Sequence, residues 1–351
     1  MEKINKIIVI RFRRVGDSVL SSSLCSSLRK TFQEATIDYV LNEEIAPLFE
    51  HHPDIDRLIT FKKEEMKDWK TYLKKVRRIM HQGNYDLIVD TRATIKTLWF
   101  SFFSLSTPYR IGKKKNYNRF FHNYRPNTKI DDDEIGQTLR LLSPLEKNFE
   151  VQYDRIFKLY VTPEEKETFR QRMKTKGIDF SKPVVVCAVA TRLAYKMWNK
   201  ERMIQLLSRI IEEYDAQLIF NFSGKEEETV ALRIQEEMNH HPRIFTHIQA
   251  NGLRELAALL SNADFFFGNE GGPRHISQAL DIPSFAIYPP KIDKKKWLPN
   301  ANERFQGLEP KDISGNAEDK RLSYAEKFNF ISVAELWKKL NPMLNKYIGK
   351  K

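Results

Sequence analysis

The chain has 351 residues, more than one typical hydrophobic core accommodates, and this length favours two domains. Hydrophobic residues make up 41% and aromatic residues 12% of the chain, which excludes a disordered protein and allows a sizeable core. A formal net charge of +13 indicates an anionic partner such as nucleic acid, an acidic membrane face or a phosphorylated substrate, although solubility alone would also account for it.

The first part of the chain alternates short apolar runs with helical patterns. Lys6–Phe12 is rich in β-branched residues, which is typical of a buried strand, and a turn at 13–16 follows it. Asp17 lies where a helix N-cap is expected, ahead of leucines at helical spacing. Further strands are predicted at 36–41, 57–61 and 85–90, and helices at 64–80 and 94–105. This alternation indicates a parallel, doubly wound sheet.

The same alternation restarts after a charged stretch at 146–182. Strands are predicted at 183–188, 217–222, 243–246, 264–267 and 283–288, and helices at 201–214, 226–238 and 253–260. A last helix is predicted over 333–340, with Ser332 as its N-cap and Pro342 just past its end.

We therefore expect an α/β protein with two Rossmann-like, doubly wound domains that face a cleft. The N-terminal domain is expected at 1–165 and the C-terminal domain at 166–325. A C-terminal helix within 326–351 follows, and packing of this helix back on the N-terminal domain is left open.

The segment 264–275 ends an apolar strand in glycines and then enters a helical pattern. Gly268, Gly271 and Gly272 are three of only 13 glycines in the chain. Such a turn exposes free backbone N–H groups at a helix start, which suits a phosphate or another anion. Glu270 either accepts a hydrogen bond from a sugar hydroxyl or binds the N–H groups of the turn. His275 is a candidate ligand-binding residue beside this anion site, although a lone histidine is more often structural.

Two other segments follow predicted strands, at the sheet edge where open parallel sheets bind ligands. In the turn at 13–18, Asp17 is either a plain N-cap or a carboxylate that accepts a proton from a hydroxyl nucleophile. The loop at 190–198 is either solvated or a phosphate site, and its candidate ligands are Thr191, Arg192 and Lys196.

Residues 107–129 contain seven Lys or Arg and no acidic residue, with five Tyr or Phe between them. This pattern favours single-stranded nucleic acid or an anionic membrane surface with aromatic anchors, and a solvated loop is the simple alternative. A second basic cluster lies at 291–296, and neither cluster comes with a helix-turn-helix or RNA-binding signature.

Several site classes lack their sequence signatures. The chain has no G-x-G-x-x-G, P-loop or G-x-S-x-G motif, and its eight histidines are too scattered to predict a metal site. Two cysteines do not make a disulfide framework, which fits a reducing cytoplasm. No stretch approaches the roughly 20 apolar residues of a spanning helix, so we expect any membrane contact to be peripheral.

The order of these turns resembles glycosyltransferase family 9, the ADP-heptose:lipopolysaccharide heptosyltransferases, over most of the chain. The family's apolar strand, Gly-Asp loop and helix match 7–28, and its strand followed by Asp, a polar residue and Lys is similar to 87–96. The family's Arg-Ile-Gly appears at 110–112. The most specific similarity is the family's Asp-Thr-Gly-Pro-x-His and following Ala-Leu-Gly-x-Pro, which resemble 270–275 and 279–283.

The resemblance implies a GT-B fold and an inverting, metal-independent transfer of a sugar, a heptose, from a nucleotide-diphosphate sugar. The expected acceptor is a hydroxyl of a lipopolysaccharide-type anionic glycolipid, and the expected place is the cytoplasmic face of the inner membrane. ADP-heptose would be the co-substrate, with no cofactor and no nucleic acid partner. Asp17 would be the general base. The donor-binding residues would be Thr191, Arg192, Lys196, Glu226, Glu227, Glu270, Gly271, Gly272 and His275. The acceptor-binding residues would be Arg13, Arg14, Lys96, Arg110 and Lys113.

The sequence departs from the family pattern on the donor side. Glu270 replaces the usual Asp, Gly271 replaces the usual Thr, and Asp281 stands where Gly is common. The loop at 190–198 also lacks the frequent Pro-Gly beginning. Three alternatives therefore stay open: transfer of another sugar in capsule or O-antigen assembly, a catalytically inactive family member, and a basic nucleic-acid-binding protein.

Overall fold

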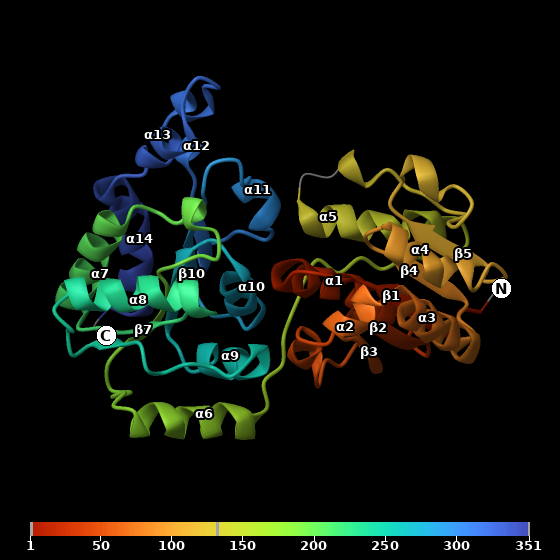
Figure 1. Ribbon diagram of the computed structural model, residues 1–351, viewed down its shortest axis with the longest axis horizontal. Coiled ribbons are helices and arrows are strands. Elements are labelled where there is room, and N and C mark those ends of the chain that lie inside the picture. The colour runs from red at the N-terminus through yellow and green to blue at the C-terminus, as the bar shows by residue number, and fades with distance from the viewer. Residues whose placement is uncertain (1–2, 131–132, 350–351) are drawn as a thin grey trace. The chain divides into compact units, whose positions relative to one another are not determined.

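The computed structural model describes residues 3–130 and 133–349 and divides into two compact units, Met1–Tyr160 and Val161–Lys351. Each unit is an all-parallel sheet flanked by helices (Figure 1). The two-domain α/β architecture predicted from the sequence is thereby confirmed. The division falls inside the charged stretch at 146–182, a few residues before the expected boundary at 165/166.

The sheet of the N-terminal unit has the strand order β3-β2-β1-β4-β5. Its strands are β1 (Lys6–Ile10), β2 (Thr36–Asn42), β3 (Arg57–Phe61), β4 (Leu87–Asp90) and β5 (Tyr109–Gly112). The central strand β1 pairs with β2 and β4, and its residues 7–10 are fully buried. Burial on both faces explains why this strand is an unbroken β-branched run rather than an alternating one.

The α-helices between these strands are α1 (Val15–Thr31), α2 (Lys63–Lys67), α3 (Trp69–Gly83) and α4 (Ile95–Phe102), and α5 (Glu134–Leu139) follows the last strand. The single helix predicted at 64–80 is interrupted at Asp68, whose carboxylate accepts hydrogen bonds from the N–H groups of Lys70 and Thr71. Asp68 therefore acts as the N-cap of α3 and separates it from α2.

The sheet of the C-terminal unit has the order β11-β10-β9-β6-β7-β8. Its strands are β6 (Val184–Ala188), β7 (Gln217–Phe220), β8 (Ile244–Phe245), β9 (Phe265–Asn269), β10 (Ser284–Ile287) and β11 (Phe305–Leu308). Its α-helices are α6 (Pro163–Thr175), α7 (Lys200–Tyr214), α8 (Lys225–Glu237), α9 (Leu253–Leu260), α10 (Gly272–Ala279), α11 (Lys294–Trp297), α12 (Pro310–Ile313), α13 (Tyr324–Asn329) and α14 (Val333–Tyr347). The pattern-based prediction missed α6 and β11 and the short helices α11, α12 and α13.

The last helix, α14, differs from its prediction at the C-terminal end. Ser332 is its N-cap as predicted, with the side chain accepting a hydrogen bond from Glu335 N at 3.1 Å. Pro342 lies inside the helix, so placing it just past the end was wrong. The apolar face continues to Leu344 and is buried in the core of the C-terminal unit, where α14 packs on α7. Burial of this face offsets the one backbone hydrogen bond that proline removes.

Candidate functional site

Both sheets reverse their strand order at one point, between β1 and β4 in the N-terminal unit and between β6 and β9 in the C-terminal unit. Open parallel sheets bind ligands beyond the carboxyl ends of the strands at such switch points. The residues that follow these four strands are therefore the candidates for a site in each unit.

An ion-pair network lies beyond the carboxyl end of β1. The side chain of Arg11 is 2% exposed, and its Nη2 donates to Asp17 Oδ1 and lies 3.4 Å from Glu134 Oε1 on α5. Arg11 Nη1 lies 3.4 Å from Thr91 Oγ1. Lys113 Nζ, beyond the end of β5, lies 3.7 Å from the same oxygen of Glu134. The network thus connects the segments that follow β1, β4 and β5 to helix α5.

Asp17 lies inside the first turn of α1 rather than at its N-cap, so the N-cap interpretation was wrong. The helix begins at Val15 because Arg13 and Arg14 adopt positive φ angles of 74° and 23° and turn the chain early. Positive φ in non-glycine residues costs on the order of 1–3 kcal/mol and clusters at functional sites. Asp17 is 8% exposed, and its Oδ2 accepts no hydrogen bond from residues 3–130 or 133–349. One carboxylate oxygen is therefore held by Arg11, and the other remains available.

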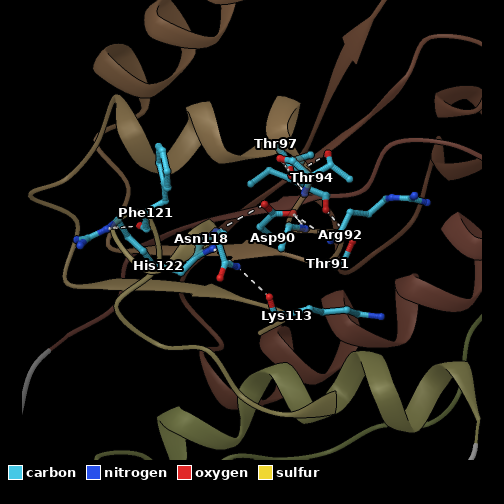
Figure 2. Close-up of polar contacts among 12 residues, drawn as sticks. Asp90, Thr91, Arg92, Thr94, Thr97, Lys113, Asn118, Phe121 and His122 are labelled. Carbon is cyan, nitrogen blue, oxygen red and sulfur yellow. Dashed lines mark hydrogen bonds and ion pairs between the residues drawn. The ribbon is translucent and has the colours of Figure 1, made fainter. Parts of the chain in front are cut away.

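Arg92, which sequence analysis did not single out, follows β4 next to this network. Burial lowers the pKa of its guanidinium, and the positive charge of Arg11 lowers it further, opposed by Asp17. The N–H groups of Arg92 and Ala93 donate to Asp90 Oδ1 at 3.0 and 2.8 Å. Figure 2 shows this turn, in which Asp90 holds the backbone that carries Arg92. A basic residue two positions after a strand-ending Asp was the only signal in the sequence.

A buried polar cluster holds the segment after β5 against β4. His122 Nε2 lies 3.5 Å from Asp90 Oδ2, and both side chains are fully buried. Asn118 Nδ2 lies 3.1 Å from His122 Nδ1 and donates to the carbonyl of Lys113 at 2.9 Å (Figure 2). Burial lowers the pKa of His122, against the opposing effect of Asp90. A side chain at Gly112 would collide with the His122 ring, so this close approach requires glycine.

Two of the predicted acceptor-binding residues hydrogen-bond to backbone carbonyls. Lys96 Nζ donates to the carbonyl of Met66. The Arg110 guanidinium donates to three carbonyls between 105 and 121, at 2.6, 2.6 and 3.0 Å. Both side chains therefore brace the fold.

The other predicted acceptor residues lie at the switch point of the N-terminal unit. Arg13 and Arg14 are exposed in the turn before α1, and Lys113 belongs to the network of Asp17. The structure thus brings Asp17, Arg13, Arg14 and Lys113 to the same sheet edge.

In the C-terminal unit, Asn269 joins the ends of β6 and β9. Its Nδ2 donates to the carbonyls of Ala188 and Val189 at 3.0 and 3.1 Å, and its Oδ1 accepts from Trp198 N at 2.8 Å. The Trp198 indole N–H donates to the Ile331 carbonyl at 3.0 Å. The loop at 190–198 is therefore fixed at both ends, and we had not expected either contact from the sequence.

Glu270 lies among positive charges at the start of α10. Its Oε1 is 3.8 Å from His275 Nε2. Burial would raise the pKa of Glu270, but the hydrogen bond with His275 and the charges of His275, Arg274 and Lys196 hold it below its usual value. Arg274, which the sequence did not point out, is fully buried and donates to the Trp297 carbonyl. The structure thus brings Lys196, Glu270 and His275 near one another, and their role in a donor site stays a prediction.

The glycine turn leaves backbone donors available. Gly271 precedes α10, and the N–H groups of Gly271 and Gly272 donate to no acceptor within the described part of the chain. Gly268 has φ 149°, and a side chain there would collide with the backbone of Ala188. The turn thus combines close strand packing with open N–H groups, the arrangement that binds anions.

The structure distinguishes the two neighbouring glutamates at the start of α8. Glu227 is half-buried, and its Oε2 accepts from Ser223 N at 2.8 Å. Burial raises its pKa, and the hydrogen bond from Ser223 and the charge of Arg192 oppose this rise. Glu226 is exposed. Thr191 Oγ1 donates to the Leu193 carbonyl at 2.8 Å, a hydrogen bond within the loop.

Within residues 3–130 and 133–349, no group of three or more His, Cys, Asp or Glu is placed to hold a metal ion. Over the same ranges, no helix has the length and apolarity needed to cross a bilayer. Burial raises the pKa of both cysteine thiols, Cys25 and Cys187, which makes them unreactive core residues.

Residues 73–312 match the family model described as "Glycosyltransferase family 9 (heptosyltransferase)". The chain is 22% identical over 289 residues to lipopolysaccharide heptosyltransferase 1 of Campylobacter coli, covering 81% of this chain and 83% of that protein. Its fold is similar to a solved family 9 glycosyltransferase of Veillonella parvula, with a TM-score of 0.81, 19% identity and 98% of each chain covered. It is also similar to E. coli ADP-heptose LPS heptosyltransferase II, with a TM-score of 0.75, 17% identity and 97% and 99% coverage. The fold is thus of the GT-B type, and the chain belongs to glycosyltransferase family 9.

Proposed function

We propose that this enzyme transfers a heptose from ADP-heptose to a hydroxyl of an anionic, lipopolysaccharide-type glycolipid. The names of the similar heptosyltransferases support the sugar, the nucleotide and the acceptor class. One observation carries the proposal: a carboxylate with an available oxygen lies at one switch point, and cations with open N–H groups lie at the other. These are the groups that a displacement with a diphosphate leaving group requires.

On the donor side, the N–H groups of Gly271 and Gly272 bind the diphosphate together with Lys196 and His275. Preorganised donors of this kind typically supply about 3–4 kcal/mol each to the transition state. Because cations and a helix start already face the leaving ADP, the reaction needs no divalent metal. Thr191 and Arg192 complete the phosphate loop.

The remaining two acidic groups of the donor site contact the sugars of ADP-heptose. Glu227, rather than the exposed Glu226, accepts a hydrogen bond from the nucleotide ribose, since its carboxylate is oriented by Ser223. Glu270 accepts a hydrogen bond from a hydroxyl of the transferred sugar, while His275 contacts the Glu270 carboxylate through Oε1.

On the acceptor side, Asp17 accepts the proton of the attacking hydroxyl through Oδ2. The oxygen of the acceptor hydroxyl forms a bond to the anomeric carbon of the sugar as the bond between that carbon and the diphosphate breaks. The electron pair of the broken bond leaves with ADP. Attack opposite the leaving group inverts the anomeric configuration. Arg13, Arg14 and Lys113 bind the anionic groups of the acceptor, and Lys96 and Arg110 act by bracing that site. The enzyme works peripherally at the cytoplasmic face of the inner membrane, where such glycolipids are held.

A thermal-shift screen of nucleotide sugars tests the donor assignment. ADP-heptose and ADP should raise the melting temperature, and UDP- and GDP-sugars should not, because a ligand stabilises the fold only by binding to it. No stabilisation by any nucleotide sugar, together with salt-sensitive binding of single-stranded oligonucleotide, would instead favour the nucleic-acid-binding alternative.

The altered residues at 270 and 271 favour a second candidate, transfer of a different sugar in capsule or O-antigen assembly. Glutamate is one methylene longer than the usual aspartate, and glycine removes the side chain of the usual threonine, so the sugar pocket changes shape. Stabilisation by an ADP-hexose but not by ADP-heptose would select this candidate. Stabilisation by ADP-heptose without transfer to heptose-free lipopolysaccharide acceptors would indicate an inactive family member.

A further inference from the structure

The N-terminal unit exposes an unusual number of large apolar side chains on neighbouring elements. Among the residues whose burial the structure describes, six of the eleven exposed large hydrophobic ones lie between 69 and 120: Trp69, Ile95, Phe102, Leu105, Tyr117 and Phe120. Phe120 is 85% exposed and Ile95 is 67% exposed. On α4, Ile95, Trp99 and Phe102 follow one another at helical spacing, so the exposed side of this helix is apolar.

Ring contacts link several aromatic side chains of these elements to one another. The ring of Trp99 lies 6.0 Å from Trp69 on α3 and 5.0 Å from Phe102, and Phe102 lies 6.2 Å from Phe121 in the segment after β5. We call the surface made by Trp69, Ile95, Trp99, Phe102, Tyr117, Phe120 and Phe121 the aromatic face. It unites α3, α4 and the segment 116–121.

The segment that carries Tyr117 and Phe120 is fixed in place. The Tyr117 hydroxyl donates to the Ala93 carbonyl at 2.9 Å, just before α4. The buried cluster of Asn118, His122 and Asp90 holds the same segment against the end of β4 (Figure 2). Phe120 is therefore presented to solvent from an anchored backbone.

The charge of the chain is concentrated around this face. Residues 91–129 contain no Asp or Glu and nine Lys or Arg: Arg92, Lys96, Arg110, Lys113, Lys114, Lys115, Arg119, Arg125 and Lys129. This segment thus supplies nine of the +13 net charges, and the rest of the chain is close to balanced. General solubility would not require such a concentration.

We propose that the aromatic face and the lysines beside it dock on an anionic lipid bilayer. Exposed aromatic and aliphatic side chains enter the interfacial layer, and each Lys or Arg near the surface adds to the attraction. A second copy of the same face would bring two strongly positive surfaces together, which charge repulsion opposes. Nucleic acid would leave Ile95 and the edge of Phe102 without a stacked base.

The location of the face fits the proposed function, on which this inference rests for the identity of the membrane-held acceptor. The helix α4 begins directly beyond the carboxyl end of β4, the sheet edge at which Asp17 and Lys113 also lie. Docking through this face would bring the headgroup region of the bilayer to the edge that binds the acceptor.

The test measures binding of the full chain to vesicles by flotation. Vesicles that contain phosphatidylglycerol should bind the protein, and neutral phosphatidylcholine vesicles should not, and binding should weaken as salt rises. Replacing the exposed pair Lys114→Glu and Lys115→Glu should weaken binding at least about tenfold. The matched control is Lys338→Glu with Lys339→Glu, an adjacent exposed pair on α14 with the same change in charge, which should retain binding.

A second pair of variants tests the apolar contribution. Phe120→Ala should weaken vesicle binding several-fold, and Leu232→Ala, which truncates a 45% exposed side chain on α8, should not. The proposal fails if the wild type does not float with anionic vesicles or if both lysine pairs behave alike. It also fails if Phe120→Ala abolishes self-association or oligonucleotide binding instead. Calorimetry with ADP-heptose separates the two proposals, because loss of vesicle binding with intact ADP-heptose binding contradicts only the docking surface.

Discussion

The two switch-point sites hold their polar groups in opposite ways. In the N-terminal unit, Arg11 pairs with Asp17 and Glu134, so the charges are buried and already neutralise one another. In the C-terminal unit, Glu270 is outnumbered by the cations around it, and the N–H groups of the glycine turn have no acceptor in the described chain. The first arrangement fits the proposed proton acceptor, and the second fits the proposed anion site.

This difference means that the two units should respond differently to the loss of a charge. In the N-terminal unit, removing one partner leaves another charge buried and unpaired, which costs stability as well as activity. In the C-terminal unit, removing a cation should weaken anion binding and leave the fold intact.

The largest expected effect is on turnover, in Asp17→Ala. Loss of a positioned base typically lowers turnover about 10²–10⁴-fold. Donor binding, measured by calorimetry with ADP-heptose, should stay close to the wild-type value because Asp17 belongs to the other unit. Asp17→Asn, which keeps the shape and loses the charge, should be equally inactive. Near-full turnover in either variant would show that Asp17 is not the base.

The comparison is tested next by Arg11→Met, which leaves Asp17 and Glu134 buried without their shared cation. Breaking a buried ion pair in this way costs about 3–5 kcal/mol. Hydrogen exchange in the N-terminal unit should accelerate, with the C-terminal unit unchanged. Adding Glu134→Gln and Asp17→Asn to Arg11→Met should recover part of the lost stability, and no recovery would mean that the cost has a source other than the two carboxylates that lost the Arg11 charge.

A smaller effect is expected for Lys196→Ala on the donor side. Loss of one phosphate-binding cation should weaken ADP binding about tenfold, with unfolding unchanged. The control is Lys200→Ala, since Lys200, at the start of α7, pairs through Nζ with Glu237 at the end of α8 rather than with the site. Equal ADP affinities in calorimetry for wild type and Lys196→Ala would remove this lysine from the donor site.

The smallest effect separates the two neighbouring glutamates. Glu227→Gln should weaken ADP binding several-fold because the oriented carboxylate becomes a neutral acceptor. Glu226→Gln, with the same change in charge one residue earlier, should have no effect. The opposite order of affinities would assign the ribose contact to Glu226.

Much of the fold was predictable because most strands are short, continuous segments of buried and often β-branched residues, a pattern that is visible within a few positions of the sequence. The donor segment at 264–275 was predictable for the same reason, since the strand, glycine turn and helix start are continuous in sequence. β5 was harder to predict because it has only four residues inside a basic segment. α6 was missed because the stretch that contains it was interpreted only as charged. For α6, the capping box of Thr162 and Glu165, with Pro163 as the first helical residue, could have revealed the helix.

The network around Asp17 was not predictable from sequence patterns. Arg11 and Glu134 are separated by 123 positions, and only the sheet topology brings them together. The start of α1 was misplaced because positive φ at Arg13 and Arg14 turns the chain before the polar residue that usually caps a helix. The sequence did not point to His122 as part of a cluster. Its partner Asp90 lies at the end of β4, and α4 and β5 separate the two residues along the chain.

The hydrogen bond from the Trp198 indole to the Ile331 carbonyl ties the phosphate loop to the chain just before the last helix. Ile331 packs in the same core as α14. The C-terminal segment 331–347 therefore stabilises the loop at 190–198, more than 130 positions earlier in the sequence. Removing this segment would therefore loosen the loop at 190–198 and open the core of the C-terminal unit together, although every residue of the proposed donor site would still be present.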